Sequence, residues 1–365
     1  MVGSRFIRDI LQNTRNIVLG CLVWGNGQPI HHLISQMNAW KNPLPSHEET
    51  NSRIFAFPGD VTKPGLGMCD ADLQFWSQHT DAILHFAGDI RLGKGDISFA
   101  TNTEACKHVF AFVQQCQKQP SLHFMSSIAS CSRSKSDPVL ETLDYPLSSV
   151  LPGGYGEQKW RAEHYLAQQA EALGVPLSIY RAPFLISDCA RQPWTVPDLL
   201  FQIALLTGTL PKAANYIPMH SLNTANRCII TNVLRTLRLP EKDQTLPKEV
   251  EVYHLADTRR LTWNDQVLDF RYAGLPVTSV VPLEDFQMRL QLAGETNRVA
   301  RKLCGSIDLL HHIFETRFPY FDTSRTERLC RQEKACFDIS NENLNIAELR
   351  EAISFSREAL ERSLQ

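Results

Sequence analysis

The sequence predicts an α/β fold in which a doubly wound parallel sheet carries a small, mainly helical cap. Strands and helices alternate over the first half of the chain, and after about residue 190 the pattern changes to proline-punctuated and helical segments. Alternation of this kind indicates right-handed βαβ units, and hence a sheet with helices on both faces. Short apolar runs have the length and composition of buried strands at 16–23, 53–61, 81–88, 121–127 and 176–182.

The helices of the first half are indicated by apolar spacing and by stop signals. The chain opens inside a helix, because Phe6, Ile7, Ile10 and Leu11 recur at helical spacing. A helix is predicted over about residues 101–117, and another begins near Tyr155. The latter ends at Gly174, with Pro176 just beyond, which is a clear stop signal.

The sequence pattern of the second half predicts a cap on the nucleotide-binding part. We place the nucleotide-binding part at residues 1–190 and a substrate-binding cap, with short strands that return to the core, at residues 191–365. The tail, 339–365, is expected to be helical and solvated. The other predicted elements are a strand at 250–255 and helices at 222–237, 263–272 and 283–292.

Composition narrows the class of protein. At 365 residues with 43% hydrophobic and 21% charged residues, the chain is typical of a globular protein with about two domains. A net charge of −2 gives no basic field, so we expect neither nucleic acid nor membrane as a partner. The ten cysteines are scattered, so we expect no metal site. No apolar run is long enough to span a bilayer, and we expect a cytoplasmic protein.

Residues 155–159 contain a candidate catalytic pair. Tyr155 lies four residues before Lys159, which places both side chains on one helix face. An ammonium near a phenol favours the phenolate, so the spacing suggests an acid–base tyrosine that exchanges a proton close to neutral pH. The alternative is an ordinary amphipathic helix, in which this spacing arises by chance.

Several motifs in this order resemble one known family. They are Tyr155-Gly156-Glu157-Gln158-Lys159-Trp160-Arg161-Ala162-Glu163, Ile179-Tyr180-Arg181-Ala182-Pro183, Asn215-Tyr216-Ile217-Pro218 and Phe321-Asp322-Thr323-Ser324-Arg325-Thr326. The chain resembles, over nearly its whole length, the thioester reductase domains of extended short-chain dehydrogenase/reductase type. Such domains end nonribosomal peptide synthetases, polyketide synthases, aminoadipate reductases and carboxylic acid reductases. The resemblance implies a Rossmann-like core and NADPH-dependent release of a carrier-bound thioester as an aldehyde, sometimes reduced further to an alcohol.

The resemblance also implies a catalytic triad of Ser127, Tyr155 and Lys159. Ser127 ends its strand and would donate a hydrogen bond to the substrate carbonyl oxygen. Tyr155 would give the proton, and Lys159 would lower the tyrosine pKa and hold the nicotinamide ribose. Ser126 is a close competitor for the serine position, and a strand-end serine satisfied by the backbone is the alternative for Ser127.

Cofactor-binding positions follow from the same resemblance. Asp60 and Val61 would meet the adenine edge, with a turn aspartate as the alternative for Asp60. Ala87 and Gly88 stand where the family has a loop that passes the cofactor. Pro183 and Phe184, which follow the predicted strand at 176–182, would pass the nicotinamide. Asn102 matches a family asparagine that ties its helix to the sheet, and we interpret it as structural at least as often as functional.

The sequence departs from the family at two places. Gly3 aligns with the last glycine of the family's G-x-x-G-x-x-G turn, so the first strand and the first two glycines have no counterpart in these residues. We expect either an incomplete start, the favoured interpretation, or a relic that binds cofactor poorly. Trp24 stands where an arginine normally pairs with the 2′-phosphate of NADP, so NADH is possible as well as NADPH.

Three functions remain open from the sequence. The first is a thioester reductase of secondary-metabolite biosynthesis, whose partner is a phosphopantetheine-bound acyl chain on a carrier protein or synthase. The second is another extended short-chain carbonyl reductase that acts on a free ketone, aldehyde or sugar nucleotide. The third is a non-catalytic remnant disabled by the missing phosphate-binding loop.

Overall fold

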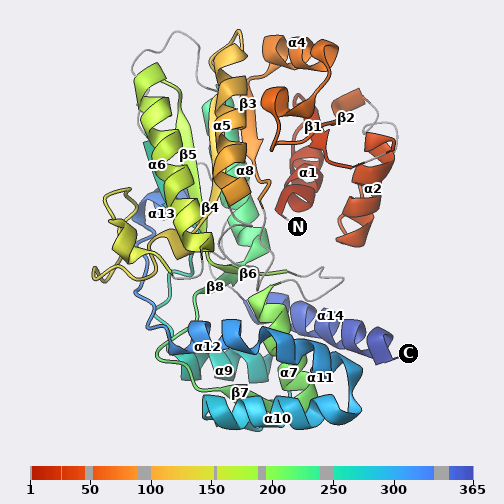
Figure 1. Ribbon diagram of the computed structural model, residues 1–365, viewed down its shortest axis with the longest axis vertical. Helices are drawn as coiled ribbons and strands as arrows, with labels where there is room; N and C mark the ends of the chain where they lie inside the picture. The colour runs from red at the N-terminus through yellow and green to blue at the C-terminus, as the bar shows by residue number, and fades with distance from the viewer. Residues whose placement is uncertain are drawn as a thin grey trace.

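The computed structural model describes residues 2–25, 27–45, 52–88, 100–151, 154–187, 195–238, 250–332 and 345–364. The strands up to residue 182 and the strand at 250–254 form two parallel sheets flanked by helices, and most of the described residues after 195 form a helical layer below them (Figure 1). The predicted domain boundary at 190/191 lies outside the described residues, and the division stays a prediction.

Parallel strands form the core. The strands that follow one another through the first half are β1 (Leu19–Val23), β2 (Ile54–Pro58), β3 (Ala82–His85), β4 (Ser121–Ser127) and β5 (Leu177–Ala182), and β9 (Val250–His254) returns to them from the cap. They make a two-stranded sheet of order β1-β2 and a four-stranded sheet of order β3-β4-β5-β9, all parallel. The predicted doubly wound α/β fold is thus confirmed.

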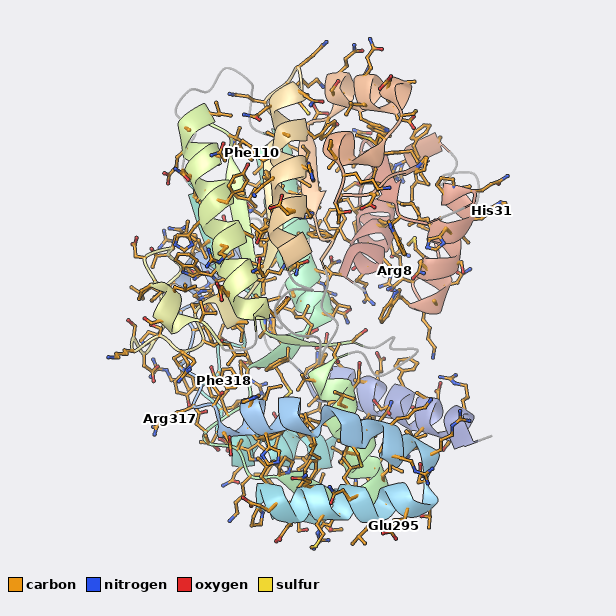
Figure 2. All side chains as sticks on the ribbon, in the orientation of Figure 1. Arg8, His31, Phe110, Glu295, Arg317 and Phe318 are labelled. Atoms are coloured by element: carbon orange, nitrogen blue, oxygen red, sulfur yellow. The ribbon has the colours of Figure 1, made fainter. Side chains whose placement is uncertain are left out.

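Helices cover both faces of the four-stranded sheet because successive strand residues point to opposite sides. Phe124 and Ile179 face α5 (Ala100–Gln115) and α6 (Tyr155–Leu173). Tyr180 and Tyr253 face α1 (Val2–Asn13) and α8 (Leu222–Arg238). In Figure 2, Phe110 of α5 lies between α5 and α6, whereas His31 and Glu295 lie at the surface.

The smaller helices of the first half are α2 (Pro29–Ala39), α4 (Asp70–His79) and the 3-10 turns η1 (Pro64–Gly67), η3 (Ile128–Ser130) and η4 (Leu147–Ser149). The sequence-based prediction did not include α2 and α4, which lack a continuous apolar stripe: α2 buries only Met37 and α4 none of its residues.

The cap has its own apolar core. Short strands β6 (Phe184–Ile186) and β8 (Met219–Ser221) pair, as do β7 (Thr209–Pro211) and β10 (Ser279–Val281). The helices and 3-10 turn are α7 (Val196–Thr207), α9 (Trp263–Tyr272), α10 (Leu283–Thr296), α11 (Arg298–Leu303), η5 (Cys304–Ser306), α12 (Ile307–Glu315), α13 (Ser324–Gln332) and α14 (Ile346–Leu364). Their buried side chains form one cluster around Phe201, Phe270 and Phe286, except in α13, whose Leu329 and Cys330 pack with α1 and α8.

The carboxyl-terminal tail differs from the expectation. It is helical in α14, but it is not a solvated helix, because Leu349, Ala352 and Ile353 are buried in the cap core. Residues 339–344 of the predicted helix lie outside the described residues. The sequence suggested solvation because charged residues occupy the other faces of the helix, which hides the narrow apolar stripe.

Gly156 fixes the start of α6 against the core. A Cβ placed there would lie 2.6 Å from the Ala129 carbonyl oxygen and 2.9 Å from the Leu151 carbonyl oxygen. Both contacts are with backbone, which cannot rotate away. The first turn of α6 therefore packs directly on η3 and on the loop before the helix.

We predict that Gly156→Ala lowers the free energy of unfolding by about 1–3 kcal/mol, the usual cost of overpacking. Gly305→Ala is the matched control, because a Cβ at Gly305 meets nothing within 4 Å. Urea unfolding of both variants measures the difference. Equal denaturation midpoints for the two variants would contradict the close packing of α6 on η3.

Candidate active site

The end of β4 and the start of α6 bring the predicted triad together. Ser127 is the last residue of β4, and its hydroxyl accepts a hydrogen bond from the Ala129 backbone N–H at 3.2 Å. The same hydroxyl is hydrogen-bonded to the Tyr155 side chain. Tyr155 begins α6 directly after Gly154, whose φ of 79° turns the chain into the helix. The serine and the tyrosine are thus in direct contact.

Burial controls the protonation of Tyr155. Removal from water raises the pKa of the Tyr155 phenol to about 12, and the hydrogen bond with Ser127 acts in the lowering direction. This is the opposite of the sequence-based expectation that Lys159 would bring the tyrosine pKa toward neutrality. At neutral pH the phenol is therefore protonated, as a proton donor must be.

Lys159 lies beside the tyrosine but is bound elsewhere. Its ammonium donates a hydrogen bond to the Met125 carbonyl oxygen at 2.8 Å and lies 5.9 Å from the centre of the Tyr155 ring. The side chain is buried, which lowers the Lys159 pKa, and the Phe124 ring centre lies 4.8 Å away. Met125 is in β4, so Lys159 ties α6 to the strand that carries Ser127.

Gly88 and Asn102 belong to the same group of residues. A Cβ added to Gly88 would lie 3.3 Å from the Asn102 Oδ1 and 3.7 Å from the Lys159 Nζ. The Gly88 backbone therefore passes directly over both side chains, and Asn102 is buried. Sequence reasoning interpreted Asn102 as a tie between helix and sheet; its nearness to Lys159 also makes it a candidate site residue.

The structure separates the two serine candidates. The Ser126 hydroxyl donates to the Glu163 carboxylate, and both side chains are buried. Ser126 is thus bound inside the sheet–helix interface, whereas Ser127 is in contact with Tyr155. The geometry favours Ser127 as the residue that can reach a substrate.

Glu163 holds this region through a buried ion pair. Its carboxylate accepts hydrogen bonds from Arg181 of β5, with Nη2 to Oε2 at 2.8 Å and Nε to Oε1 at 3.1 Å, and from the Ser130 hydroxyl at 3.0 Å. The Arg181 and Glu163 side chains are only 1% and 0% exposed. Helix α6, strand β5, the end of β4 and η3 are therefore joined at one carboxylate.

A second buried carboxylate ties the Phe321–Thr326 motif to the sheet. Glu141 accepts hydrogen bonds from the His254 N–H at 2.9 Å, the Arg325 N–H at 2.5 Å and the Thr326 hydroxyl at 2.6 Å. Arg181 has only donors, so the His254 Nε2 facing it accepts, and the His254 Nδ1–H donates to the Asp322 carbonyl oxygen at 2.8 Å. The motif is thus bound through the backbone, and Glu141, which no sequence pattern indicated, is its anchor.

Apart from Gly3, the other predicted cofactor residues lie just after the carboxyl ends of strands, where such folds bind ligands. Trp24 follows β1 and is 72% exposed. Asp60 and Val61 follow β2, Ala87 follows β3, and Pro183 and Phe184 follow β5. Gly3 is in the first turn of α1, where an added Cβ would lie 3.9 Å from the Phe86 ring. The strand-end positions therefore lie at the carboxyl ends of two parallel sheets.

Asp60 is engaged in a turn. Its Oδ1 accepts hydrogen bonds from the Thr62 N–H at 2.9 Å and the Thr62 hydroxyl at 2.6 Å, which hold the pKa of the carboxyl below its usual value. This is the turn aspartate considered as an alternative. An adenine contact by Asp60 stays a prediction.

The residues present fit the nicotinamide end of a dinucleotide. The Gly88 backbone, a protonated phenol, a buried ammonium and the strand-end hydroxyl of Ser127 lie together. For the pyrophosphate, the first turn of α1 carries Gly3 and no acidic residue, so its backbone N–H groups suit an anion. Among the described residues, no group of three His, Cys, Asp or Glu side chains is arranged to hold a metal, and no helix could span a membrane.

We predict that Glu163→Gln lowers the free energy of unfolding by about 3–5 kcal/mol, because it leaves the buried Arg181 charge without its partner. The matched control is Glu157→Gln on the same helix. Glu157 pairs with Arg161, but both side chains are largely exposed, so its loss costs about 0–1 kcal/mol. Chemical denaturation measures the free energy of unfolding of both variants. Similar losses in the two would contradict the larger contribution that we assign to the buried Glu163 pair.

Comparisons with known proteins identify the family. The family model described as "Male sterility protein" matches residues 1–217. Curated relatives include the PKS-NRPS hybrid synthetase cheA of Chaetomium globosum, 30% identical over 190 residues, which are 49% of this chain and 4% of that protein. Another is the hybrid PKS-NRPS synthetase pydA of an Acremonium species, 28% identical over 204 residues, which are 54% of this chain and 5% of that protein. The chain thus spans about a twentieth of these relatives.

Solved structures share the fold. The terminal R domain of the myxalamid PKS-NRPS pathway has a TM-score of 0.77 at 17% identity, covering 100% of this chain and 89% of that one. The reductase domain of a nonribosomal peptide synthetase from Mycobacterium tuberculosis has a TM-score of 0.75 at 15% identity, covering 99% and 89%. The family match covers more than half of the chain, the relatives are hybrid synthetases, and the fold is that of synthetase reductase domains. The chain belongs to the male sterility protein family and resembles the terminal reductase domains of polyketide and nonribosomal peptide synthetases.

Proposed function

We propose that this protein is a cytoplasmic NADPH-dependent thioester reductase that releases an acyl or peptidyl chain from a carrier protein as an aldehyde. The observation that carries the proposal is the hydrogen bond between Ser127 and a protonated Tyr155, beside the buried Lys159. The likeness to terminal reductase domains supports a substrate held on a phosphopantetheine arm, in secondary-metabolite biosynthesis.

The triad would bind and protonate the substrate carbonyl. In this proposal the Ser127 and Tyr155 hydroxyls both donate hydrogen bonds to the thioester carbonyl oxygen. Negative charge develops on that oxygen as hydride reaches the carbonyl carbon, and two preorganised donors stabilise it. Tyr155 then gives its proton to the oxygen, which yields a hemithioacetal. Cleavage of the carbon–sulfur bond releases the aldehyde and the carrier thiol.

The cofactor would be held by residues along the strand ends. NADPH, when bound, supplies the hydride. Lys159 and Tyr155 would bind the nicotinamide ribose, and the backbone at Ala87 and Gly88 would lie along the cofactor. In the proposed arrangement Pro183 and Phe184 line the nicotinamide side, Asp60 and Val61 the adenine side, and Gly3 the pyrophosphate.

We predict that Tyr155→Phe lowers the rate of NADPH oxidation with an acyl-pantetheine thioester by about 10²–10⁴-fold, the usual contribution of a positioned acid. Tyr272→Phe, on an exposed residue of α9, is the control and keeps full activity. Aldehyde formation is followed by trapping with a hydrazine. Turnover of free carbonyls alone would favour another carbonyl reductase, and absence of cofactor binding by calorimetry would favour a non-catalytic protein.

We predict that Trp24→Arg raises the affinity for NADPH but not for NADH. The exposed Trp24 side chain directly after β1 can stack on adenine but cannot neutralise a 2′-phosphate, whereas arginine binds phosphate through two hydrogen bonds. Fluorescence titration of both cofactors measures the change. Trp24→Phe is the control that keeps the ring without adding charge, and an equal response of the two cofactors would exclude this placement of Trp24.

A further inference from the structure

The Asn215-Tyr216-Ile217-Pro218 motif lies at the junction between the sheet and the cap, directly before β8. Figure 1 shows β8 and its partner β6 between the main sheet and the helical layer. Residues 316–323, which connect α12 to α13, pass beside the motif, because the Asn215 side chain binds Phe318. We call residues 316–323 the connecting segment. The proposed chemistry gives neither the motif nor this segment a role.

Asn215 holds the backbone of Phe318 with both ends of its amide. The Asn215 Nδ2 donates to the Phe318 carbonyl oxygen at 2.5 Å, and the Oδ1 accepts from the Phe318 N–H at 3.1 Å. The neighbouring Tyr216 hydroxyl donates to the Pro319 carbonyl oxygen at 2.8 Å. Three hydrogen bonds therefore fix the start of the connecting segment on the motif.

The same motif also holds Phe184. The Pro218 carbonyl oxygen accepts from the Phe184 N–H at 3.0 Å, and Phe184 pairs with Met219 in the register of β6 and β8. The Phe184 and Phe318 rings meet edge to face, with centres 6.3 Å apart and planes at 89°. Phe318 is 1% exposed, whereas Phe184 is half-buried. The motif thus fixes both members of an aromatic pair of which one stays partly open.

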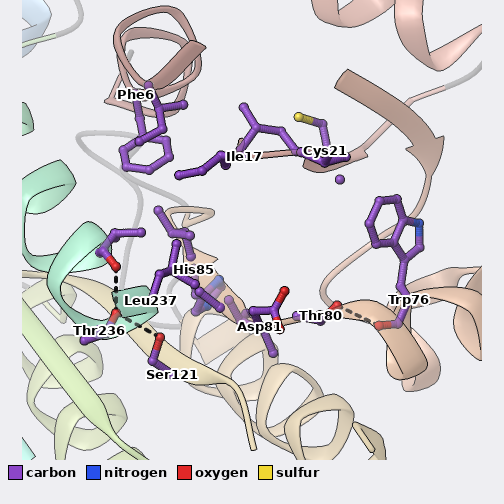
Figure 3. A pocket seen from close by; sticks show the side chains of 18 of the residues that line it. Phe6, Ile17, Cys21, Trp76, Thr80, Asp81, His85, Ser121, Thr236 and Leu237 are labelled. Carbon is purple, nitrogen blue, oxygen red and sulfur yellow. Dashed lines mark hydrogen bonds between the residues drawn. The ribbon is translucent and has the colours of Figure 1, made fainter. Parts of the chain in front are cut away.

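The open member of the pair lies next to the candidate active site. Ala182, the last residue of β5, pairs with Ser127 in the register of β4 and β5. Phe184 follows Ala182 by two residues, so the two Cα atoms are at most about 7 Å apart. The cavity between β1 and β3 is a different feature (Figure 3), because its described lining includes Ser121, at the opposite end of β4, but neither ring of the pair.

We propose that Asn215 and Phe318 are positioning residues for the nicotinamide ring of NADPH, and that they act through Phe184. This inference rests on the proposed function, which places Phe184 on the nicotinamide side. A Phe184 ring braced by a buried neighbour has little rotamer freedom left to lose when the cofactor binds. The cost of ordering this side chain is therefore met on folding, and the ring presents a fixed wall to the nicotinamide.

The test compares two ligands on the full chain by calorimetry. One is NADPH, and the other is 2′-phospho-ADP-ribose, which has the same adenosine and pyrophosphate but no nicotinamide. Phe318→Leu should weaken NADPH binding about threefold to tenfold, the size of one edge-to-face contact, and leave 2′-phospho-ADP-ribose binding unchanged. Asn215→Ala should act in the same direction, because it releases the backbone of Phe318. Equal changes for both ligands, or no change, would overturn the proposal.

The matched control loosens the chain beyond the connecting segment without touching the aromatic pair. Thr326→Val removes the hydrogen bond from the Thr326 hydroxyl to Glu141 and keeps the shape of the side chain. It should lower stability but leave the affinities for both ligands as they are. A selective loss of NADPH affinity in Thr326→Val would overturn the proposal, because any loosening of this region would then have the same effect.

A double-mutant cycle tests whether Phe318 acts through Phe184. When Phe184→Leu is already present, adding Phe318→Leu should cause no further loss of NADPH affinity. Losses that multiply would overturn the proposal. A wild-type protein that binds NADPH no more tightly than 2′-phospho-ADP-ribose, or that binds neither, would overturn it as well. A wild-type protein that binds NADPH and reduces no acyl-pantetheine thioester would overturn the proposed function alone.

Discussion

The ion pair at the buried carboxylate of Glu163 is the interaction on which the candidate active site depends. The carboxylate sits in the middle of α6 and receives Arg181 from β5, Ser126 from the end of β4 and Ser130 from η3. A buried charge is tolerated only when its hydrogen-bonding capacity is filled, so these elements are held in one relative position. Ser127 and Tyr155 lie on the two elements that Glu163 joins, and their contact is a consequence of that arrangement.

The fold therefore divides the candidate site into a rigid part and an open part. The rigid part contains Ser127, Tyr155 and Lys159, and it is backed by the closely packed start of α6 at Gly156. The open part lies on the β1–β2 sheet, where Trp24 and Asp60 follow β1 and β2, a pair of strands not joined to the four-stranded sheet in the described residues. Acid–base groups and the predicted adenine and phosphate contacts thus rest on separate sheets.

Much of the core could be predicted from local pattern. β4 agrees with the prediction residue for residue, and α6 ends at Gly174 as its stop signal indicated. Strands covered on both faces give continuous apolar runs, which are easy to recognise. Helices α2 and α4 were missed because few of their residues are buried, and α14 was taken as solvated because its buried residues form a narrow stripe. Burial, rather than local propensity, decided these elements.

The sequence by itself determined the fold class, the succession of strands along the chain and the Tyr155–Lys159 pair, because each can be recognised from the pattern of local segments. Only the tertiary structure showed that Ser126 binds Glu163 whereas Ser127 contacts Tyr155, brought Asn102 and Gly88 to Lys159, and set the direction of the Tyr155 pKa. Those properties depend on contacts between distant segments and on exclusion of water. Spacing within a helix cannot reveal how deeply its first turn is buried.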